Sequence, residues 1–232
     1  MKVLHIWNTA GVGSIIAKYM DKLFGVKSLV VHRKRFDPYG VTVYGELWDC
    51  GAKIFVLKCL WLARKFDIIH VHALDKIVPF LKILYPRKPV VLHHHGSDIR
   101  GRWSSRRKYW SRADIILYST LDLLNHETPK HAVYMPNPID TEFFHPHPIK
   151  PKPKTALHFS YNADDLARKY AEKYNLNLTI MRRGIPYLKL PETLVKYEYY
   201  IDVKRSRNGV LLKGSLSKTA LEALACGVKV IR

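Results

Sequence analysis

Three consecutive histidines, His93–His95, precede a glycine and an aspartate in the segment VVLHHHGSD, and imidazoles bind metals, transfer protons or contact substrates. On a strand, His93 and His95 point to one face and His94 to the other. A zinc site needs three or four converging ligands, which adjacent positions of one strand do not supply. We therefore expect no metal site, a core or hinge role for His93 and His94, and a place for His95 at the mouth of a ligand cleft.

The segment NTAGVGS, residues 8–14, places Gly11 and Gly13 between a predicted strand and a predicted helix. Glycines let the backbone approach a ligand closely, and the helix N-terminus that follows favours an anion. The third glycine of the dinucleotide fingerprint is replaced by Ile16, and basic residues 33–35 stand where an NAD enzyme needs an acid. The loop predicts a cradle for a substrate or phosphate, or else a tight structural turn, and it argues against NAD.

The segment SLSKTALEALACG, residues 215–227, predicts a helix capped by Ser217 and ended by Gly227. Lys218 lies in the first turn, where a cation opposes the helix dipole unless an anion docks there. Glu222 lies beside the apolar stripe of this helix. The alternative for Lys218 is a solvated side chain.

A third segment, RGRWSSRRKYWSR at residues 100–112, interleaves basic and aromatic residues. This composition suits anionic lipid headgroups or single-stranded nucleic acid, and the alternative is a solvated helix face with some core aromatics. The formal net charge of +20 also predicts an anionic partner, without selecting one. The residues concerned are Arg102, Trp103, Arg106, Arg107, Lys108 and Trp110.

The elements that position these residues alternate between strands and helices, which predicts α/β architecture with parallel sheets covered on both faces. Predicted strands are 2–7, 28–32, 41–46, 67–73, 89–95 and 114–119, and predicted helices are 14–24, 52–66, 76–84 and 104–113. They form a doubly wound domain over residues 1–144. The Pro- and Lys-rich segment 145–154 predicts a semi-rigid linker that forms neither a helix nor a central strand. The alternation then resumes in a shorter domain, residues 155–232, and a cleft is expected between the two domains.

Taken together, these segments resemble the retaining family 4 glycosyltransferases of the GT-B fold. ALEALACGVKVI is similar to the second half of that family's glutamate motif, and PNPIDTEFFHP to the segment that ends its N-terminal domain. The glycine loop, DIIHVHA, HHHGSD and ADIILYS follow in the family's order. The resemblance implies two Rossmann-like domains, the second abbreviated or truncated. It also implies an enzyme that transfers a sugar from a nucleotide-sugar donor with retention and needs no obligatory cofactor or metal.

The resemblance also implies roles for individual residues. Glu222 would hold the ribose of the donor, and His95 would line the donor-sugar pocket as the catalytic residue. The expected donor-binding set is Gly11, Gly13, Lys204, Arg205, Lys218, Thr219 and Glu222. Two departures favour a non-catalytic relative as the alternative: Gly214 replaces the family's earlier glutamate, and HFSYNADD lacks the clamping arginine.

The resemblance also implies a partner, because the family often acts on lipid-linked acceptors. We expect the basic and aromatic residues of segment 100–112 to contact an anionic membrane or a phosphorylated lipid acceptor. Nucleic acid remains a lesser alternative. The widely spaced cysteines and an N-terminus without a signal-peptide pattern predict a cytoplasmic protein, peripheral on the cytoplasmic face of a membrane. The absence of glutamine and the many lysines suggest a thermophilic source.

Overall fold

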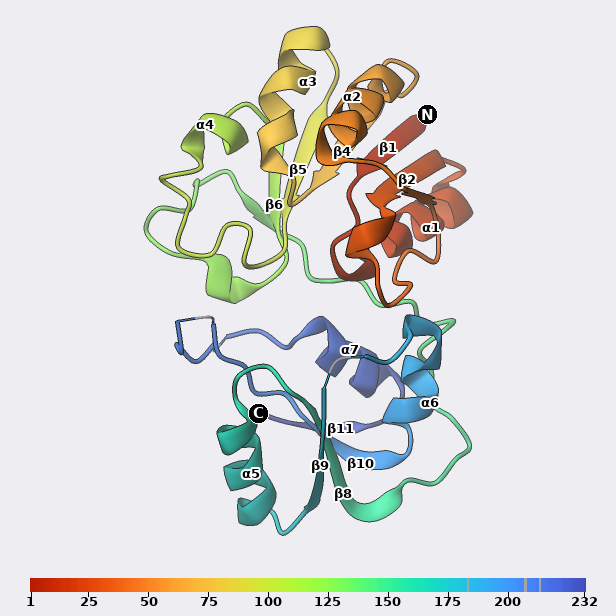
Figure 1. Ribbon diagram of the computed structural model, residues 1–232, viewed down its shortest axis with the longest axis vertical. Coiled ribbons are helices and arrows are strands. Elements are labelled where there is room, and N and C mark those ends of the chain that lie inside the picture. Colours follow the sequence, from red (N-terminus) through yellow and green to blue (C-terminus); the bar gives the residue numbers. More distant parts are fainter. Residues whose placement is uncertain (183, 207, 213) are drawn as a thin grey trace. The chain divides into compact units, whose positions relative to one another are not determined.

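The computed structural model describes residues 1–182, 184–206, 208–212 and 214–232. The chain forms two compact units, which we call unit 1 (Met1–Pro138) and unit 2 (Ile139–Arg232). Each unit is built on its own parallel β-sheet with helices beside it (Figure 1). The expected α/β class with two doubly wound domains is therefore confirmed.

The sheet of unit 1 has seven parallel strands in the order β3-β2-β1-β4-β5-β6-β7. Its strands are rich in Val, Ile and Leu, as expected for strands buried on both faces. Their bounds are β1 Lys2–Ile6, β2 Lys27–Arg33, β3 Glu46–Trp48, β4 Ile68–His72, β5 Val90–His94, β6 Ile115–Tyr118 and β7 Val133–Tyr134.

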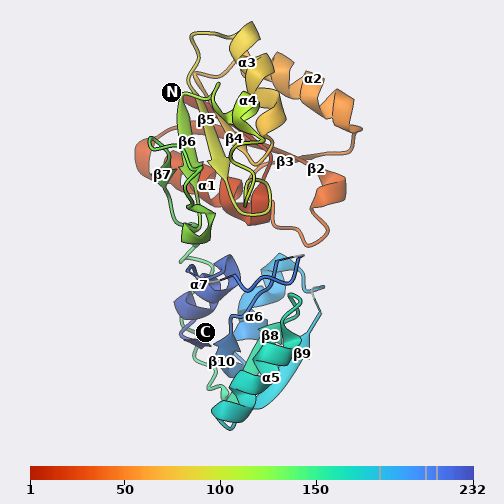
Figure 2. The same ribbon diagram turned by 90° about the vertical axis from the view of Figure 1, so that its left-hand side faces the viewer.

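Helices cover both faces of this sheet, with α2 and α3 together on one face and α1 on the other (Figures 1 and 2). The core on the α2 side joins Leu4, Ile69 and Leu92 of the sheet to Phe55 of α2 and Leu81 of α3. The bounds are α1 Val12–Phe24, α2 Ala52–Ala63, α3 Val78–Leu84 and α4 Arg107–Trp110, with 3-10 turns at Thr9–Gly11, Lys34–Phe36, Asp75–Ile77 and Leu121–Leu123.

Two predicted elements of unit 1 are wrong. The helix expected over 104–113 is the single turn α4, because the indole N–H of Trp110 donates to the carbonyl of Trp103 at 2.6 Å and so takes an acceptor that a longer helix would use. The strand expected over 41–46 is irregular, because the Asp37 carboxylate accepts the backbone N–H groups of Val41 and Thr42, at 2.7 and 2.9 Å. A side-chain donor in the first place and a side-chain acceptor in the second thus replace regular backbone bonding.

The sheet of unit 2 has four parallel strands in the order β11-β10-β8-β9. The strands are β8 Lys152–Phe159, β9 Asn177–Met181, β10 Tyr197–Ile201 and β11 Lys229–Ile231. The helices are α5 Asp164–Lys173, α6 Leu190–Leu194 and α7 Lys218–Ala225, with a 3-10 turn at Tyr187–Lys189. The predicted cap is confirmed, because the Ser217 side chain accepts from the N–H of Ala220 at 3.0 Å. Gly227 has φ +81°, as a helix stop requires.

The prediction that residues 145–154 form no central strand is wrong at its C-terminal end. β8 begins at Lys152 and lies between β10 and β9. A register shift between Tyr197 and Tyr199 lets the strand accommodate Pro153, which has no N–H to donate. The N–H of Lys154 instead donates to the Glu198 carboxylate at 2.7 Å.

Among the described residues, no helix is long and apolar enough to span a bilayer.

Candidate functional site

The strand order of unit 1 reverses direction between β1 and β4, which makes their carboxyl ends the topological switch point of the sheet. Doubly wound sheets bind ligands at such points. The glycine loop follows β1, His72 ends β4, and His95 follows β5 directly. Trp7 and Ala73, which come directly after β1 and β4, both have positive φ (76° and 59°). Strained non-glycine backbone of this kind clusters at functional sites.

The glycine loop is held closely against its surroundings. Gly11 has φ +79°, and a Cβ there would lie 3.0 Å from the carbonyl oxygen of Val41. A Cβ on Gly13 would lie 3.1 Å from Oδ1 of Asn8 and 3.3 Å from Nε2 of His72. The Asn8 side chain accepts the N–H of Ser14 at 3.1 Å in the first turn of α1. Packing alone therefore requires both glycines, and the loop brings the N-terminus of α1 against His72.

His95 is half-buried and held from several sides. Its Nε2 lies 3.1 Å from Nδ1 of His72, and its Nδ1 lies 3.0 Å from Oγ of Ser119. The side chain of Asn137, from the PNP segment, also bonds to the ring. Burial lowers the pKa of His95 to about 4, although the Asp98 carboxylate and the Asn137 bond act in the opposite direction. The ring is therefore neutral at pH 7, with one nitrogen as donor and the other as acceptor.

The alternation of the three histidines is confirmed. His93 and His95 both lie near Ser119, whose Oγ is 2.8 Å from Nε2 of His93. His94 points to the other face, where its Nδ1 lies 2.7 Å from Oδ2 of Asp98 and its ring packs edge-on against Trp103. The other oxygen of Asp98 accepts the backbone N–H groups of His95 and Gly96. Asp98 thus fixes the backbone at the end of β5.

Sequence reasoning missed a row of buried histidines on the same face of the sheet. His5 on β1 lies opposite His70 on β4, and His72 lies opposite His93 on β5. Burial lowers the pKa of His5 to about 4 and the pKa values of His70, His72 and His93 well below the ordinary value of 6.5. The signal was present as His-x-His in both 70–72 and 93–95, on strands predicted to be parallel. A single strand does not supply converging ligands, but these rings come from three strands.

The segment 100–112 differs from our expectation of a membrane contact. Trp103 is fully buried and Trp110 is 9% exposed, and the Trp103 indole donates to the carbonyl of Leu123 at 2.8 Å. These two tryptophans are core residues, so the prediction that they contact a membrane is wrong for the folded protein. Arg106 forms a bidentate ion pair with the buried carboxylate of Asp75. The exposed basic residues of the predicted set are Arg102, Arg107 and Lys108.

In unit 2 the strand order reverses between β8 and β10, and Lys204 and Arg205 come soon after β10. Lys204 lies over the ring of Tyr161, with its Nζ 4.3 Å from the ring centroid. Arg205 pairs through both terminal nitrogens with the Asp165 carboxylate. Lys218 and Thr219 open α7, whose cap residue Ser217 donates its N–H to the carboxylate of Asp202 at 2.8 Å. The structure thus brings the predicted cations to one edge of this sheet, with Arg205 already paired.

Glu222 lies inside unit 2, only 2% exposed. Its carboxylate forms an ion pair with Lys218 one turn earlier and a hydrogen bond with the hydroxyl of Tyr187. Burial, together with the charge of Glu222, raises the pKa of Tyr187 far above its ordinary value, so the phenol remains protonated as a donor. Lys218 also lies 3.3 Å from that hydroxyl. A ribose hydroxyl could bind the Glu222 carboxylate only beside Lys218 and Tyr187 or by displacing one of them. The role of Glu222 in donor binding remains a prediction.

A cavity of about 570 Å³ in unit 2 lies elsewhere, with Lys152, Asn177 and Tyr197 in its lining. These residues begin β8, β9 and β10, so the cavity is at the amino ends of the strands. Ligands of doubly wound sheets bind at the carboxyl ends, and we assign this cavity no role.

No protein-family model and no curated protein sequence matches the chain. Among solved structures, it is similar to sucrose-phosphate synthase from Thermosynechococcus elongatus, with a TM-score of 0.55 and 11% identity over 99% of this chain and 80% of that one. The glycosyltransferase VinC in complex with dTDP gives a TM-score of 0.49 and 10% identity over 87% and 75% of the two chains. A match to TubZ of Clostridium botulinum phage c-st covers about half of each chain, 54% and 55%, at a TM-score of 0.37 and 14% identity. The first likeness shows that the fold is α/β and GT-B-like.

Proposed function

We propose that this protein transfers a glycosyl group from a nucleotide-sugar donor to an acceptor, with retention of configuration. The observation that carries the proposal is the position of His95, a neutral and half-buried imidazole at the carboxyl end of β5 beside the switch point of the sheet. The GT-B-like fold supports it, because similar chains include glycosyltransferases.

In unit 1, His95 would hydrogen-bond the transferred sugar through whichever ring nitrogen the ligand displaces from its present partner. The ring is held by His72, Ser119 and Asn137, so its orientation does not depend on the ligand. Gly11 and Gly13 would let the diphosphate approach the first turn of α1, where the helix N-terminus favours negative charge. A preorganised site of this kind stabilises developing charge without reorganising during the reaction.

In unit 2, Lys204, Arg205, Lys218 and Thr219 would bind the diphosphate, and Glu222 the ribose. Two of the cations have carboxylate partners, Asp165 for Arg205 and Glu222 for Lys218. A diphosphate would compete with those carboxylates for the same charge-assisted hydrogen bonds. Basic side chains and helix N-termini would then stabilise the departing diphosphate, so no metal is required in this step.

The test is a screen of nucleoside diphosphates and their sugars for thermal stabilisation, followed by a transfer assay with the ligand that binds. A ligand at 100 times its Kd stabilises the folded state by about 2.7 kcal/mol. The His95→Ala variant should lose turnover by about 100-fold or more while it binds the nucleoside diphosphate unchanged. The anomeric configuration of the product, read by NMR, tests retention. A fully active His95→Ala protein would remove the proposed role of this residue.

A second candidate is a non-catalytic relative that binds nucleotide sugars. The pairing of Arg205 and Lys218 with carboxylates favours it, since neither cation is poised for a departing diphosphate. In that case the same screen would find a ligand, but donor hydrolysis and transfer would both be absent with every acceptor tried.

For the membrane contact, we propose the exposed surface of α2 and α3 in place of the buried tryptophans. Ile54, Leu57 and Trp61 of α2 are each more than half exposed. On α3, which packs against α2, the apolar side chains of Phe80, Ile83 and Leu84 are also more than half exposed. Residues 51–66 contain no acidic side chain. The exposed cations Lys53, Lys58, Arg64 and Lys65 border the apolar ones, and the charged end of Arg64 lies 4.2 Å from the Trp61 ring centroid. Aromatic and basic side chains on one apolar surface suit an anionic bilayer.

Binding to vesicles of phosphatidylglycerol and phosphatidylcholine tests this surface. The Leu57→Glu/Trp61→Glu variant should lose binding, whereas the matched variant Arg107→Ser/Lys108→Ser should lose only the part that two surface charges supply, about 1 kcal/mol each. Loss in the second variant alone would move the contact to segment 100–112. No binding by the unmodified protein would end the membrane proposal.

A further inference from the structure

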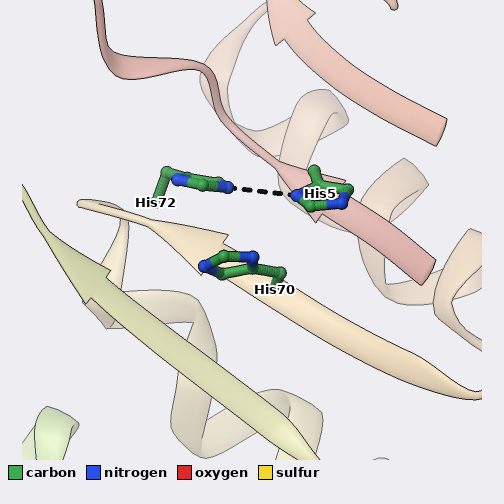
Figure 3. Close-up of side chains that lie close together, drawn as sticks. All are labelled: His5, His70 and His72. Atoms are coloured by element: carbon green, nitrogen blue, oxygen red, sulfur yellow. Dashed lines mark hydrogen bonds between the residues drawn. The ribbon is translucent and has the colours of Figure 1, made fainter. Parts of the chain in front are cut away.

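The row of buried histidines in unit 1 has a ligand geometry that the proposed sugar transfer does not use. His5, His70 and His72 each offer a ring nitrogen, and these three atoms lie within 4.8 Å of one another (Figure 3). The three residues are 0%, 6% and 0% exposed. They come from β1 and β4, the neighbouring strands at the switch point, so the sheet itself fixes their spacing.

The distances suit a tetrahedral ion. Nδ1 of His5 and Nε2 of His72 are 3.2 Å apart. Two nitrogens on a tetrahedral ion, each at 2.0–2.1 Å, are about 3.3 Å apart. The ring of His70 stacks on that of His72, with 4.1 Å between centroids, and its ligand nitrogen lies within 4.8 Å of the other two. All three rings are neutral at pH 7, which is the form of histidine that binds metals.

Nε2 of His70 is buried and, within the described part of the chain, has no hydrogen-bond partner. Burying such an atom without a partner is costly, and a bound cation relieves that cost. Apolar packing alone would be served better by Val or Ile, the residues that dominate these strands elsewhere.

We propose that His5, His70 and His72 form a binding site for one divalent transition-metal ion of the zinc, cobalt and nickel class. Imidazole ligands without a carboxylate favour these ions over Mg²⁺ and Ca²⁺, which prefer oxygen. Three protein ligands leave a fourth tetrahedral position for water or another small ligand.

A second set, His72, His93 and His95, also lies within 4.8 Å, but it is the weaker candidate. Ser119 already lies within hydrogen-bond distance of His93 and His95. Since both sets share His72, which presents Nε2 to His5 and Nδ1 to His95, a neutral His72 binds one ion at a time. The site therefore takes one equivalent per chain.

Metal on Nε2 of His72 would fix the remaining hydrogen bonds in one direction. Nδ1–H of His72 would donate to Nε2 of His95, and Nδ1–H of His95 would donate to Ser119. Metal-binding histidines commonly use their second ring nitrogen in this way, which sets the tautomer and orientation of both rings. The ion would thus orient His95 without touching it.

The experiment uses the untagged, full-length protein, stripped with chelator and titrated with Co²⁺ and then Zn²⁺. We expect one equivalent of ion retained through gel filtration, a tetrahedral Co²⁺ visible spectrum, and a raised melting temperature. The His70→Gln variant should bind more than about 100-fold more weakly. The matched variant His93→Gln and a variant with the exposed His126, His131, His145 and His147 changed to Gln should both retain the ion.

Imidazole ¹⁵N NMR of the unmodified protein keeps the test decisive if His70→Gln fails to fold. Zinc should shift the ring nitrogens of His5, His70 and His72 at one equivalent. The proposal is overturned if the unmodified protein retains no ion, if the exposed-histidine variant loses it, or if His93→Gln loses it while His70→Gln retains it. It is equally overturned if zinc leaves those ring nitrogens unshifted.

Discussion

Substitutions of Asp98 test how the end of β5 is held, because the two carboxylate oxygens make different hydrogen bonds. Oδ1 accepts the N–H groups of His95 and Gly96, at 3.1 and 2.7 Å, and Oδ2 faces Nδ1 of His94 at 2.7 Å. The Asp98 side chain is 14% exposed and His94 is fully buried. Asparagine preserves the first oxygen and replaces the second with an N–H donor, so Asp98→Asn removes one interaction and spares two.

The expected cost of Asp98→Asn is roughly 1.5–3 kcal/mol, the range for a hydrogen bond to a charged group. The new amide and the His94 N–H would face each other as donors unless His94 changes tautomer. That change would place its N–H on Nε2, which is buried and has no partner in the described part of the chain. Asp98→Ala removes all three bonds to the carboxylate and should therefore cost more than Asp98→Asn.

The difference between wild type and Asp98→Asn should depend on pH in one direction. Burial raises the pKa of Asp98, but the bonds from His94 and Gly96 outweigh burial, so its pKa lies below the ordinary value of 3.8. A carboxylate with a lowered folded-state pKa stabilises the protein above its unfolded-state pKa. That stabilisation is lost as the pH falls through the folded-state value. The gap should therefore be full at pH 7 and shrink below about pH 4.

Urea unfolding followed by tryptophan fluorescence measures these quantities for unit 1 alone, because all five tryptophans lie in residues 1–138. Equal stability of wild type and Asp98→Asn at pH 7 would show that the His94–Asp98 contact contributes nothing. Equal losses for the asparagine and alanine variants would show that the two backbone bonds are unimportant. A gap that persists unchanged at pH 3 would contradict the assigned charge state.

Three further changes test the packing on which the site depends. Gly11→Ala should destabilise unit 1 more than Gly25→Ala does. Both glycines have positive φ, which costs an alanine about 1–2 kcal/mol, but only at Gly11 would the added Cβ lie against a carbonyl oxygen. Urea midpoints followed by fluorescence compare the two variants. Trp103→Phe should cost roughly 0.5–1.5 kcal/mol, because the carbonyl of Leu123 loses the indole N–H and keeps only the longer bond from Thr128. Thermal unfolding by circular dichroism measures the change, and an unchanged midpoint would contradict it. Glu222→Ala should destabilise unit 2 by roughly 3–5 kcal/mol, because Lys218, only 10% exposed, would lose its carboxylate partner. A variant as stable as wild type would show that Glu222 is not needed for folding, which would favour a role in ligand binding.

Local sequence patterns predicted the elements well where each depends on its own residues. The apolar strands, helices α1, α2 and α7, the Ser217 cap and the alternation of His93–His95 all follow from spacing and residue type. The failures lie where a nearby side chain competes for the hydrogen bonds of the backbone. The carboxylate of Asp37 replaced a strand, and the indole of Trp110 shortened a helix. Neither competitor is visible in the periodicity of the segment it alters.

The histidine cluster was missed for a different reason, which is strand order. His5 and His70 are 65 residues apart in the sequence, yet they lie opposite each other because β1 pairs with β4. Sequence patterns predict strands but not which strand pairs with which, so His-x-His on two strands did not indicate convergence. A parallel sheet brings the carboxyl ends of its strands to one edge, and this is where His72 and His95 lie.

The high net positive charge can be divided into cations that pair with carboxylates and cations that remain exposed. Several carboxylates are already engaged, Asp75 by Arg106, Asp98 by His94, Asp165 by Arg205 and Glu222 by Lys218. With 39 basic and 19 acidic residues, cations remain in excess on the surface even after every acid is paired. Exposed charges of this kind are screened by salt within about 10 Å at 0.1 M, whereas the buried pair of Lys218 and Glu222 is screened much less. Binding to an anionic surface through α2 should therefore weaken as salt rises. A diphosphate that must displace Glu222 from Lys218 should respond to salt much less, and this contrast separates the two anion-binding roles within one protein.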